Sequence, residues 1–319
     1  MLIKTDWSNV RNRIDDIAAS EHSYRVGGSM VLPDIDNFTD NGLSQLGQKL
    51  HFPSWFVREL ENSGHKDLAT DIVTTRKEDF FRRYKPGETP LLFREFKDHD
   101  GENRIHGVLS DKYSIFDDKE VADIVESSDY LMNAEEVWAN IDPEHLHCRF
   151  ISGNKLYLNG DDSPLSMCVF VDNSMVGKAM LTIRFGLYRW ACTNGMITGL
   201  KQFSIVREKH IGANKYWNDI VAEAMRNIGA YEEMLLNMVT DMSATRSVIY
   251  GMSDEDAARY IKDKLATSTK MANKILDFYQ NTYGGTSKWD LCNAITDVAH
   301  ELGNLENRLF FEQRAMNVA

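Results

Sequence analysis

Apolar and polar residues recur at two spacings in the first half of the chain, and each spacing predicts a different element. Residues 5–20 place apolar side chains at helical spacing behind a capping residue, Asp6 or Ser8, which predicts a short helix. Residues 44–50 and 53–60 predict two more short helices, the second with Pro53 in its first turn. This pair resembles a DNA-reading helix-turn-helix, but the second helix offers few polar residues that could read bases. It holds Trp55, Phe56 and Val57, for which we expect burial.

The clearest hairpin pattern lies in residues 89–109. Two runs, 89–97 and 104–109, are rich in strand-forming side chains, and Asp100-Gly101 between them is a strong turn signal. A short helix is expected over residues 118–127. Strand patterns then return at residues 137–139, 145–151, 155–158 and 165–171. Because short turns join these runs, they predict a mostly antiparallel sheet in the middle of the chain.

After Gly212 the apolar residues recur only at helical spacing. They predict three long helices, over residues 217–239, 254–279 and 289–309, with Thr286 or Ser287 capping the third. We expect these helices to pack on one another and on one face of the sheet. The predicted fold class is therefore α+β, with an α+β domain over residues 1–212 and a helical region over residues 213–319. The two regions share one core and can equally form one continuous domain.

Charge singles out residues 178–209, which we call the basic segment. It holds six basic residues and one acidic residue, whereas the whole chain has a formal net charge of −12. Its residues alternate as in a strand from Met180 to Phe185 and again from Lys201, around the sequence Thr193-Asn194-Gly195, which predicts a hairpin. Aromatic residues lie between its cations, namely Phe185, Tyr188, Trp190 and Phe203.

A second basic stretch precedes the first hairpin. Residues 74–85 carry five basic and two acidic residues, with Phe80, Phe81 and Tyr84 among them. The pattern is typical of a solvated helix with an apolar stripe. The alternative is that the stretch contributes to a phosphate-binding surface.

Composition limits the class of protein. The four cysteines form no CxxC pair, which favours reduced thiols and a cytoplasmic location. No apolar run approaches about 18 residues, and the first residues lack the apolar core of a signal peptide, so we expect no membrane partner. The acidic balance argues against non-specific coating of nucleic acid over the whole surface, but it leaves room for one local basic track.

Familiar catalytic and cofactor motifs are missing from the sequence. It contains no GxxxxGK[ST], no GxGxxG after a strand, no HExxH and no GxSxG. His145 and His147 lie on one face of a predicted strand, with Glu144 or Cys148 as candidate further ligands, but structural histidines are the favoured interpretation. Cys192 is expected to be a small buried thiol rather than half of a Cys–His pair. We therefore predict no catalytic residue, no metal and no cofactor.

One short motif resembles a known family. Arg189, Cys192, Asn194 and Gly195 match the R-x-x-C-x-N-G signature of a large family of uncharacterised phage- and plasmid-borne proteins. Residues 109–113 (LSDKY) and 289–296 (WDLCNAIT) resemble flanking parts of the same family, so the likeness spans roughly residues 40–310. The resemblance implies a mobile-element setting and DNA metabolism.

These features favour a single-stranded DNA-binding protein, similar in its task to phage single-strand annealing proteins. Cations would neutralise phosphates and aromatic rings would stack on bases, and annealing needs no nucleotide hydrolysis. Such proteins work as rings or filaments, so we expect a homo-oligomer. The expected phosphate contacts are Arg184, Arg189, Lys201 and Arg207, the expected stacking rings are Tyr188 or Trp190, and the second choices are Lys112, Tyr113, Arg82 and Arg83.

Two other functions stay open at this point. An acidic phage product that binds a host defence or replication protein explains the net charge more directly, but it does not explain the basic segment. A nuclease is the lesser alternative, because we find no carboxylate cluster at suitable spacing. For Phe185 and Phe203 a place in the core is expected, and Arg189 and Cys192 can also have structural roles.

Overall fold

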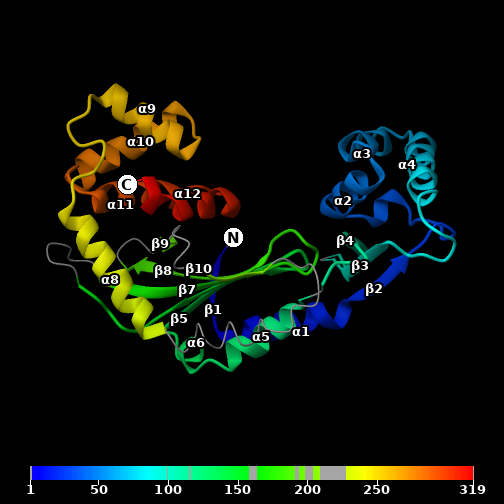
Figure 1. Cartoon of the computed structure of the whole chain (residues 1–319), viewed down its shortest axis with the longest axis horizontal. Helices are drawn as coiled ribbons and strands as arrows, with labels where there is room; N and C mark the ends of the chain where they lie inside the picture. The colour runs from blue at the N-terminus through cyan, green and yellow to red at the C-terminus, as the bar shows by residue number, and fades with distance from the viewer. Residues whose placement is uncertain are drawn as a thin grey trace.

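Two antiparallel sheets form the frame of the molecule, which we describe from a computed structural model (Figure 1). The structure describes residues 2–98, 100–114, 116–157, 164–190, 194–197, 204–208 and 228–318. The larger sheet consists of β1 (Ile3–Thr5), β5 (Glu136–Asp142), β6 (His145–Ile151), β7 (Leu165–Asn173), β8 (Leu181–Arg189), β9 (Asn194–Ile197) and β10 (Ser204–Glu208). Its strand order is β1-β5-β6-β7-β8-β10, and β9 also pairs with β8.

The smaller sheet belongs to an N-terminal lobe. Its strand order is β2-β3-β4, with bounds β2 (His22–Val26), β3 (Leu91–Lys97) and β4 (Asn103–Ser110). The helical part of the lobe consists of the 3₁₀ helix η1 (Ile35–Asn37), α2 (Asp40–Leu50), α3 (Ser54–Asn62) and α4 (Lys66–Phe81). The lobe has its own apolar core, in which Leu43, Leu46 and Phe93 are buried. We use "N-terminal lobe" for residues 22–110 below.

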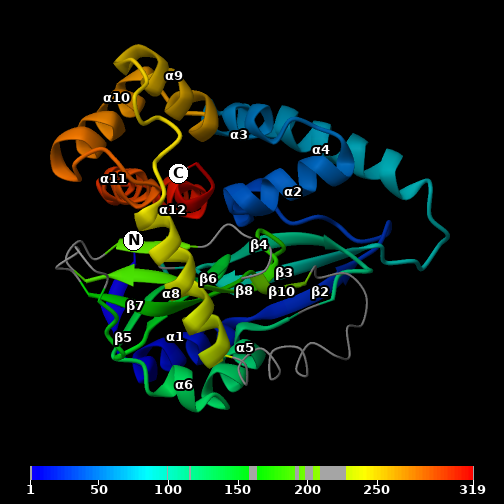
Figure 2. The same ribbon diagram turned by 60° about the vertical axis from the view of Figure 1, so that its left-hand side comes forward.

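Helices lie on both sides of the larger sheet. Three lie beneath it in Figures 1 and 2, namely α1 (Trp7–Ser20), α5 (Asp118–Glu126) and α6 (Asp129–Met132). The C-terminal helices are α8 (Ile228–Ala244), α9 (Asp254–Leu265), α10 (Thr269–Asp277), the π-helical turn η3 (Phe278–Thr282), α11 (Lys288–His300) and α12 (Leu305–Val318). In Figure 1, α9 to α12 lie above the larger sheet at one end of the molecule, and α2 to α4 lie above the smaller sheet at the other end.

The fold class predicted from the sequence is confirmed. The hairpin of β3 and β4 forms around Gly101, whose φ of 87° is readily adopted only by glycine. The C-terminal helical group is present, and the structure divides two of its long helices. Ala266 at φ 49° ends α9, and the side chain of Ser268 then caps α10.

One expected strand does not form. Residues 155–158 were predicted as a strand, but the described part of that stretch contributes only an isolated bridge from Leu156 to Leu165. Just before it, the side chain of Ser152 accepts a hydrogen bond from the backbone of Asn154 and turns the chain out of β6. Side-chain-to-backbone bonds of this kind compete with the sheet ladder. The prediction was therefore wrong for this stretch.

The turn between β7 and β8 joins the N-terminal lobe to the larger sheet. The backbone oxygens of Ser174, Met175 and Val176 accept hydrogen bonds from side chains of Tyr113 (3.0 Å), Arg94 (2.9 Å) and Gln45 (2.8 Å). A Cβ on Gly107 would lie 2.8 Å from the Cβ of Val176, so only glycine lets β4 approach this turn so closely. The turn thus fixes where the lobe attaches.

None of the described helices combines the length and the apolar composition that crossing a bilayer requires.

Candidate nucleic-acid interface

The basic segment forms the predicted hairpin. Strand β10 pairs antiparallel with β8, and the register shifts between Ser204 and Val206. Strand β9 pairs with the other half of the same edge of β8, from Gly186 to Arg189. The segment therefore lies at the edge of the larger sheet, as an exposed binding track requires.

Its arginines do not share one face. Arg184 and Arg189 are five residues apart in β8, whose pairing with β7 is continuous over both positions. Because side chains alternate along a strand, an odd separation places them on opposite faces. Burial agrees with this, since Phe185 and Leu187 lie in the main core whereas Tyr188 packs in a separate cluster with Ile151 and Phe170. The expectation of one continuous cationic face was therefore wrong.

Arg184 is held by a carboxylate. Its guanidinium forms an ion pair with Asp172 on the neighbouring strand, and the other oxygen of Asp172 binds Nδ1 of His147. Burial alone would raise the pKa of Asp172, but the charges of His147 and Arg184 outweigh burial and lower it well below its usual range. The side chain of Arg184 is only 14% exposed. Its charge is thus largely neutralised within the protein and little of it faces solvent.

The predicted aromatic contacts are engaged as well. Tyr188 is 2% exposed, and burial raises its pKa to about 12, so its ring does not present a face to a base. Trp190 is half-buried, donates through Nε1 to Ser166 Oγ at 2.8 Å, and has Lys155 Nζ 4.5 Å from its ring centre. The guanidinium carbon of Arg189 lies 5.7 Å from the ring centre of Tyr283. These contacts fit structural roles, and the proposed DNA contacts of Arg189 and Trp190 stay predictions.

The remaining predicted residues divide into three groups. Lys201 and Cys192 lie outside the described residues, and for Arg207 the structure describes only the backbone, which pairs with Thr182. Lys112 is exposed, whereas Tyr113 donates to the Ser174 backbone and has a pKa raised by burial. Arg82 and Arg83 are both exposed at the end of α4. These last two line a pocket together with a third exposed cation, Arg76.

Exposed basic side chains gather around a pocket at the end of α4. Leu50, His51, Arg76, Asp79, Phe80, Arg82 and Arg83 line a pocket of about 340 Å³, which we call the α4 site. It lies where the end of α2 meets the end of α4. His51 follows α2 with a left-handed backbone (φ 60°), which closes that helix and turns the chain toward α3.

Positive charge dominates the α4 site. Asp79 Oδ1 forms an ion pair with Arg82 Nη1 at 3.1 Å, but the Arg82 side chain remains 73% exposed. Arg76 and Arg83 are exposed, and within the described parts of the chain the side chain of neither forms an ion pair or a hydrogen bond. Cations near a helix C-terminus also stabilise its dipole, which accounts for part of this arrangement. The dipole does not require three arginines around one pocket.

An aromatic pair lies at the α4 site, and two further aromatic residues are exposed on the helix α3 that follows His51. Phe80 lines it and is half-buried, and its ring centre is 5.1 Å from that of Tyr84, which is 38% exposed. Trp55 is 73% exposed and Phe56 is 39% exposed, in the helix that begins three residues after His51. The expectation that Trp55 and Phe56 are buried was therefore wrong. Only Val57 of that apolar run points into the core, since a short helix buries one narrow stripe.

The sequence carried a partial signal for this site. The five cations and three aromatic residues of the stretch 74–85 were visible, and they led to Arg82 and Arg83 as second choices. His51 and Leu50 were missed because they come from another helix, more than 20 residues earlier in the chain. Only the packing of α2 against α4 brings them together.

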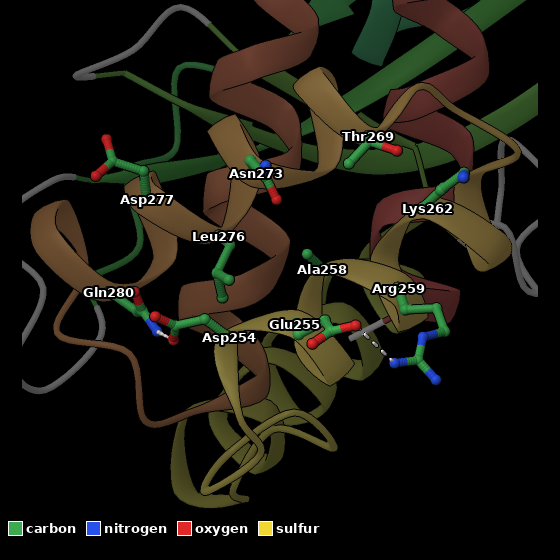
Figure 3. A pocket seen from close by; sticks show the side chains of 10 residues that line it. All are labelled: Asp254, Glu255, Ala258, Arg259, Lys262, Thr269, Asn273, Leu276, Asp277 and Gln280. Carbon is green, nitrogen blue, oxygen red and sulfur yellow. Dashed lines mark hydrogen bonds and ion pairs between the residues drawn. The ribbon is translucent and has the colours of Figure 1, made fainter.

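A larger pocket lies between α9 and α10, and Figure 3 shows its lining. It measures about 580 Å³, with Leu276 and Ala258 in its floor. Its charges oppose one another: Glu255 pairs with Arg259 at 3.6 Å, and Asp254 accepts from Gln280 at 2.9 Å. A pocket without a dominant sign of charge gives no reason to favour a nucleic acid.

The two histidines on β6 are engaged in contacts within the protein. The rings of His145 and His147 stack with centres 6.0 Å apart, and His147 is fully buried against Asp172. Among the described residues, no group of three or more His, Cys, Asp or Glu side chains could hold a metal ion. Cys148, Cys168 and Cys292 are buried, and burial raises the pKa of each thiol. Such thiols are poor nucleophiles.

The part of the chain that matches a known family contains most of the larger sheet and the C-terminal helices. Residues 105–316, about two thirds of the chain, match the model of a domain of unknown function, DUF932. The chain belongs to the DUF932 family. No curated protein and no solved structure matches it. The DUF932 match begins inside β4, so the α4 site lies in a part of the chain that precedes the matched segment.

Proposed function

We propose that this DUF932 protein binds single-stranded DNA and that the α4 site makes the principal contact. The observation that carries the proposal is the set of exposed arginines at one pocket, two of them without a carboxylate partner among the described residues. In a chain with a net charge of −12, this site offers phosphate an attractive surface. The basic segment is not proposed as the main track, because Asp172 already neutralises Arg184.

Arginine and exposed aromatic rings together suit a single strand. Guanidinium groups bind phosphate oxygens with two parallel hydrogen bonds, and each phosphate neutralised releases counterions. The rings of Tyr84 and Trp55 are accessible to unpaired bases, whose stacking is worth roughly 1–3 kcal/mol per base. A duplex hides its bases, so it would use the cations but not the rings. The combination therefore favours single-stranded DNA.

We further propose that the protein promotes strand annealing as a homo-oligomer, in a phage or plasmid setting. Annealing draws its free energy from base pairing, so it needs no nucleotide hydrolysis, and one modest site per subunit adds up along a strand when subunits form a ring or filament. The setting is supported by the likeness of Arg189 and Gly195 to the family signature. Mass photometry with and without a long single strand tests the assembly. Growth on DNA is expected, and an unchanged mass contradicts it.

Fluorescence anisotropy with a labelled oligothymidine tests the binding site. If Arg82 and Arg83 each contact a phosphate, the variant Arg82→Ala/Arg83→Ala should bind at least roughly tenfold more weakly at about 50 mM salt. Its plot of log affinity against log salt should also be shallower by about 1.4, because a single strand contributes about 0.7 per phosphate. The matched control is Arg259→Ala, which removes an arginine that is 60% exposed on α9 and paired with carboxylates.

The titration also defines failure. Affinity that is undetectable at about 50 mM salt, or that does not change with salt, would refute DNA binding. Equal losses in the α4 variant and in Arg259→Ala would mean that binding depends on overall charge and not on the α4 site. Melting curves of both variants verify that the fold is intact.

A further inference from the structure

The lining of the α4 site combines two kinds of side chain. Its basic residues are Arg76, Arg82, Arg83 and His51. Its apolar residues are Leu50, which is buried, and Phe80, which is half-buried. Asp79 is the only acidic residue among the described residues of the lining, and it forms an ion pair with Arg82. A ligand that fills this pocket must therefore have an anionic end and a flat or apolar end.

The size of the pocket limits that ligand. Its volume of about 340 Å³ is near the lower end of the range for small-molecule pockets, roughly 300–1,000 Å³. Such a space is of the size of one base with its sugar and phosphate. An inorganic anion alone would leave the apolar residues of the lining unused.

Phe80 is held in a fixed position. Its ring centre lies 5.1 Å from that of Phe81, with the rings almost perpendicular, and 5.1 Å from that of Tyr84. Phe81 is itself buried in the core of the N-terminal lobe. An aromatic ring that is braced on two sides loses little conformational entropy when a base packs against it.

We infer that the α4 site is a pocket for a single nucleotide, in which Arg76 and Arg83 hold the phosphate of a nucleoside monophosphate and Phe80 packs against its base. The inference deepens the proposed function and rests on it, because it names the part of the strand that the α4 site holds. The nucleotide can come from a strand end or be free in solution, since the chemistry is the same. Arg76 and Arg83 are assigned the phosphate because Arg82 is shared with Asp79.

Isothermal titration calorimetry separates the contributions of the basic and the apolar lining residues to affinity. Thymidine 5′-monophosphate, thymidine and inorganic phosphate are each titrated into the full chain. The nucleotide is expected to bind at least tenfold more tightly than either thymidine or phosphate, because only the nucleotide contacts both kinds of residue. A free nucleotide that competes with a 5′-phosphorylated oligothymidine, but not with an oligothymidine lacking that phosphate, would assign the pocket to strand ends.

Two variants give the residue-level test. Arg83→Gln should weaken nucleotide and inorganic phosphate by a similar factor, whereas Phe80→Leu should weaken the nucleotide at least fivefold and leave phosphate unchanged. Melting curves exclude unfolding, and Arg83→Gln, at an exposed position, remains informative if Phe80→Leu unfolds.

The failures of the two proposals can be told apart. A chain that binds oligothymidine but neither competes with nor binds the monophosphate overturns the nucleotide pocket and leaves DNA binding intact. A chain that binds the monophosphate but no oligonucleotide upholds the pocket and overturns the proposed function. Phosphate bound as tightly as the nucleotide would reduce the α4 site to a simple anion site and overturn the inference.

Discussion

The buried carboxyl group of Asp118 has an unusual pKa. Asp118 begins α5, is 2% exposed and accepts a hydrogen bond from Asn173 at 2.7 Å. Burial, reinforced by the nearby charge of Asp117, raises its pKa to about 7. Because Asp118 keeps its proton more readily in the folded state, its contribution to stability is fully present below pH about 4, the usual carboxyl value, and is lost as the pH rises through about 7.

Asp118→Asn should therefore change how stability depends on pH. Asparagine has a similar shape and is neutral at every pH. Between about pH 4 and 7, the free energy of unfolding of the variant should gain on that of the parent by about 1.4 kcal/mol per pH unit. Urea unfolding at pH 5, 6, 7 and 8 measures the difference. Parallel pH profiles for the two proteins would show that Asp118 titrates normally.

At the scale of single residues, the sequence showed where basic side chains occur but not which carboxylates they would pair with. The basic residues of the two stretches were visible, and Arg82 and Arg83 are exposed as a binding role requires. The pairing of Arg184 with Asp172 was not predictable, because it depends on the register of β8 against β7. A shift by one residue would have placed Arg184 on the opposite face.

Helix α12 is fastened to the larger sheet by a buried ion pair. Arg149 of β6 donates through Nη2 to Glu312 at 2.6 Å, and the two side chains are 2% and 0% exposed. Arg308 donates to the other oxygen of Glu312 at 2.8 Å. Glu312 thus links α12 to β6 through a buried ion pair.

Glu312→Gln should be strongly destabilising. It leaves Arg149 buried without its counter-charge, and breaking a buried pair in this way costs roughly 3–5 kcal/mol. The control is Glu301→Gln, which breaks the exposed pair with Lys274 (50% and 41% exposed) and should cost less than about 1 kcal/mol. Urea unfolding of both variants gives the comparison. Similar losses in the two variants would contradict the role assigned to Glu312.

At the scale of elements, the helices, strands and caps that depend on neighbouring residues could be predicted from the sequence, and a break without a local signal could not. The hairpin of β3 and β4, α1 and the cap at Ser287 follow from nearby residues and were predicted. The division of the helix at Ala266 was missed, because alanine gives no sign of the left-handed backbone that it adopts there. Only the cap at Ser268, two residues later, marked the break.

At the scale of the whole molecule, the N-terminal lobe and the C-terminal helices lie at opposite ends of the molecule (Figure 1). This arrangement depends on pairings far apart in the chain, such as β1 with β5 and β2 with β3, for which the sequence carries no local signal. It places the α4 site in the lobe, away from the basic segment. The proposed binding surface is therefore not the segment with the larger net positive charge in the sequence, residues 178–209, but the α4 site, where the arginines are exposed.

Photo-crosslinking tests this location most directly. An oligonucleotide that carries 5-iododeoxyuridine is crosslinked to the full chain, and the modified peptides are identified by mass spectrometry. We predict crosslinks within residues 50–85, above all at Phe80, Tyr84 or Trp55, and their loss in Arg82→Ala/Arg83→Ala. Crosslinks confined to residues 181–208, or spread evenly over the chain, would contradict the account.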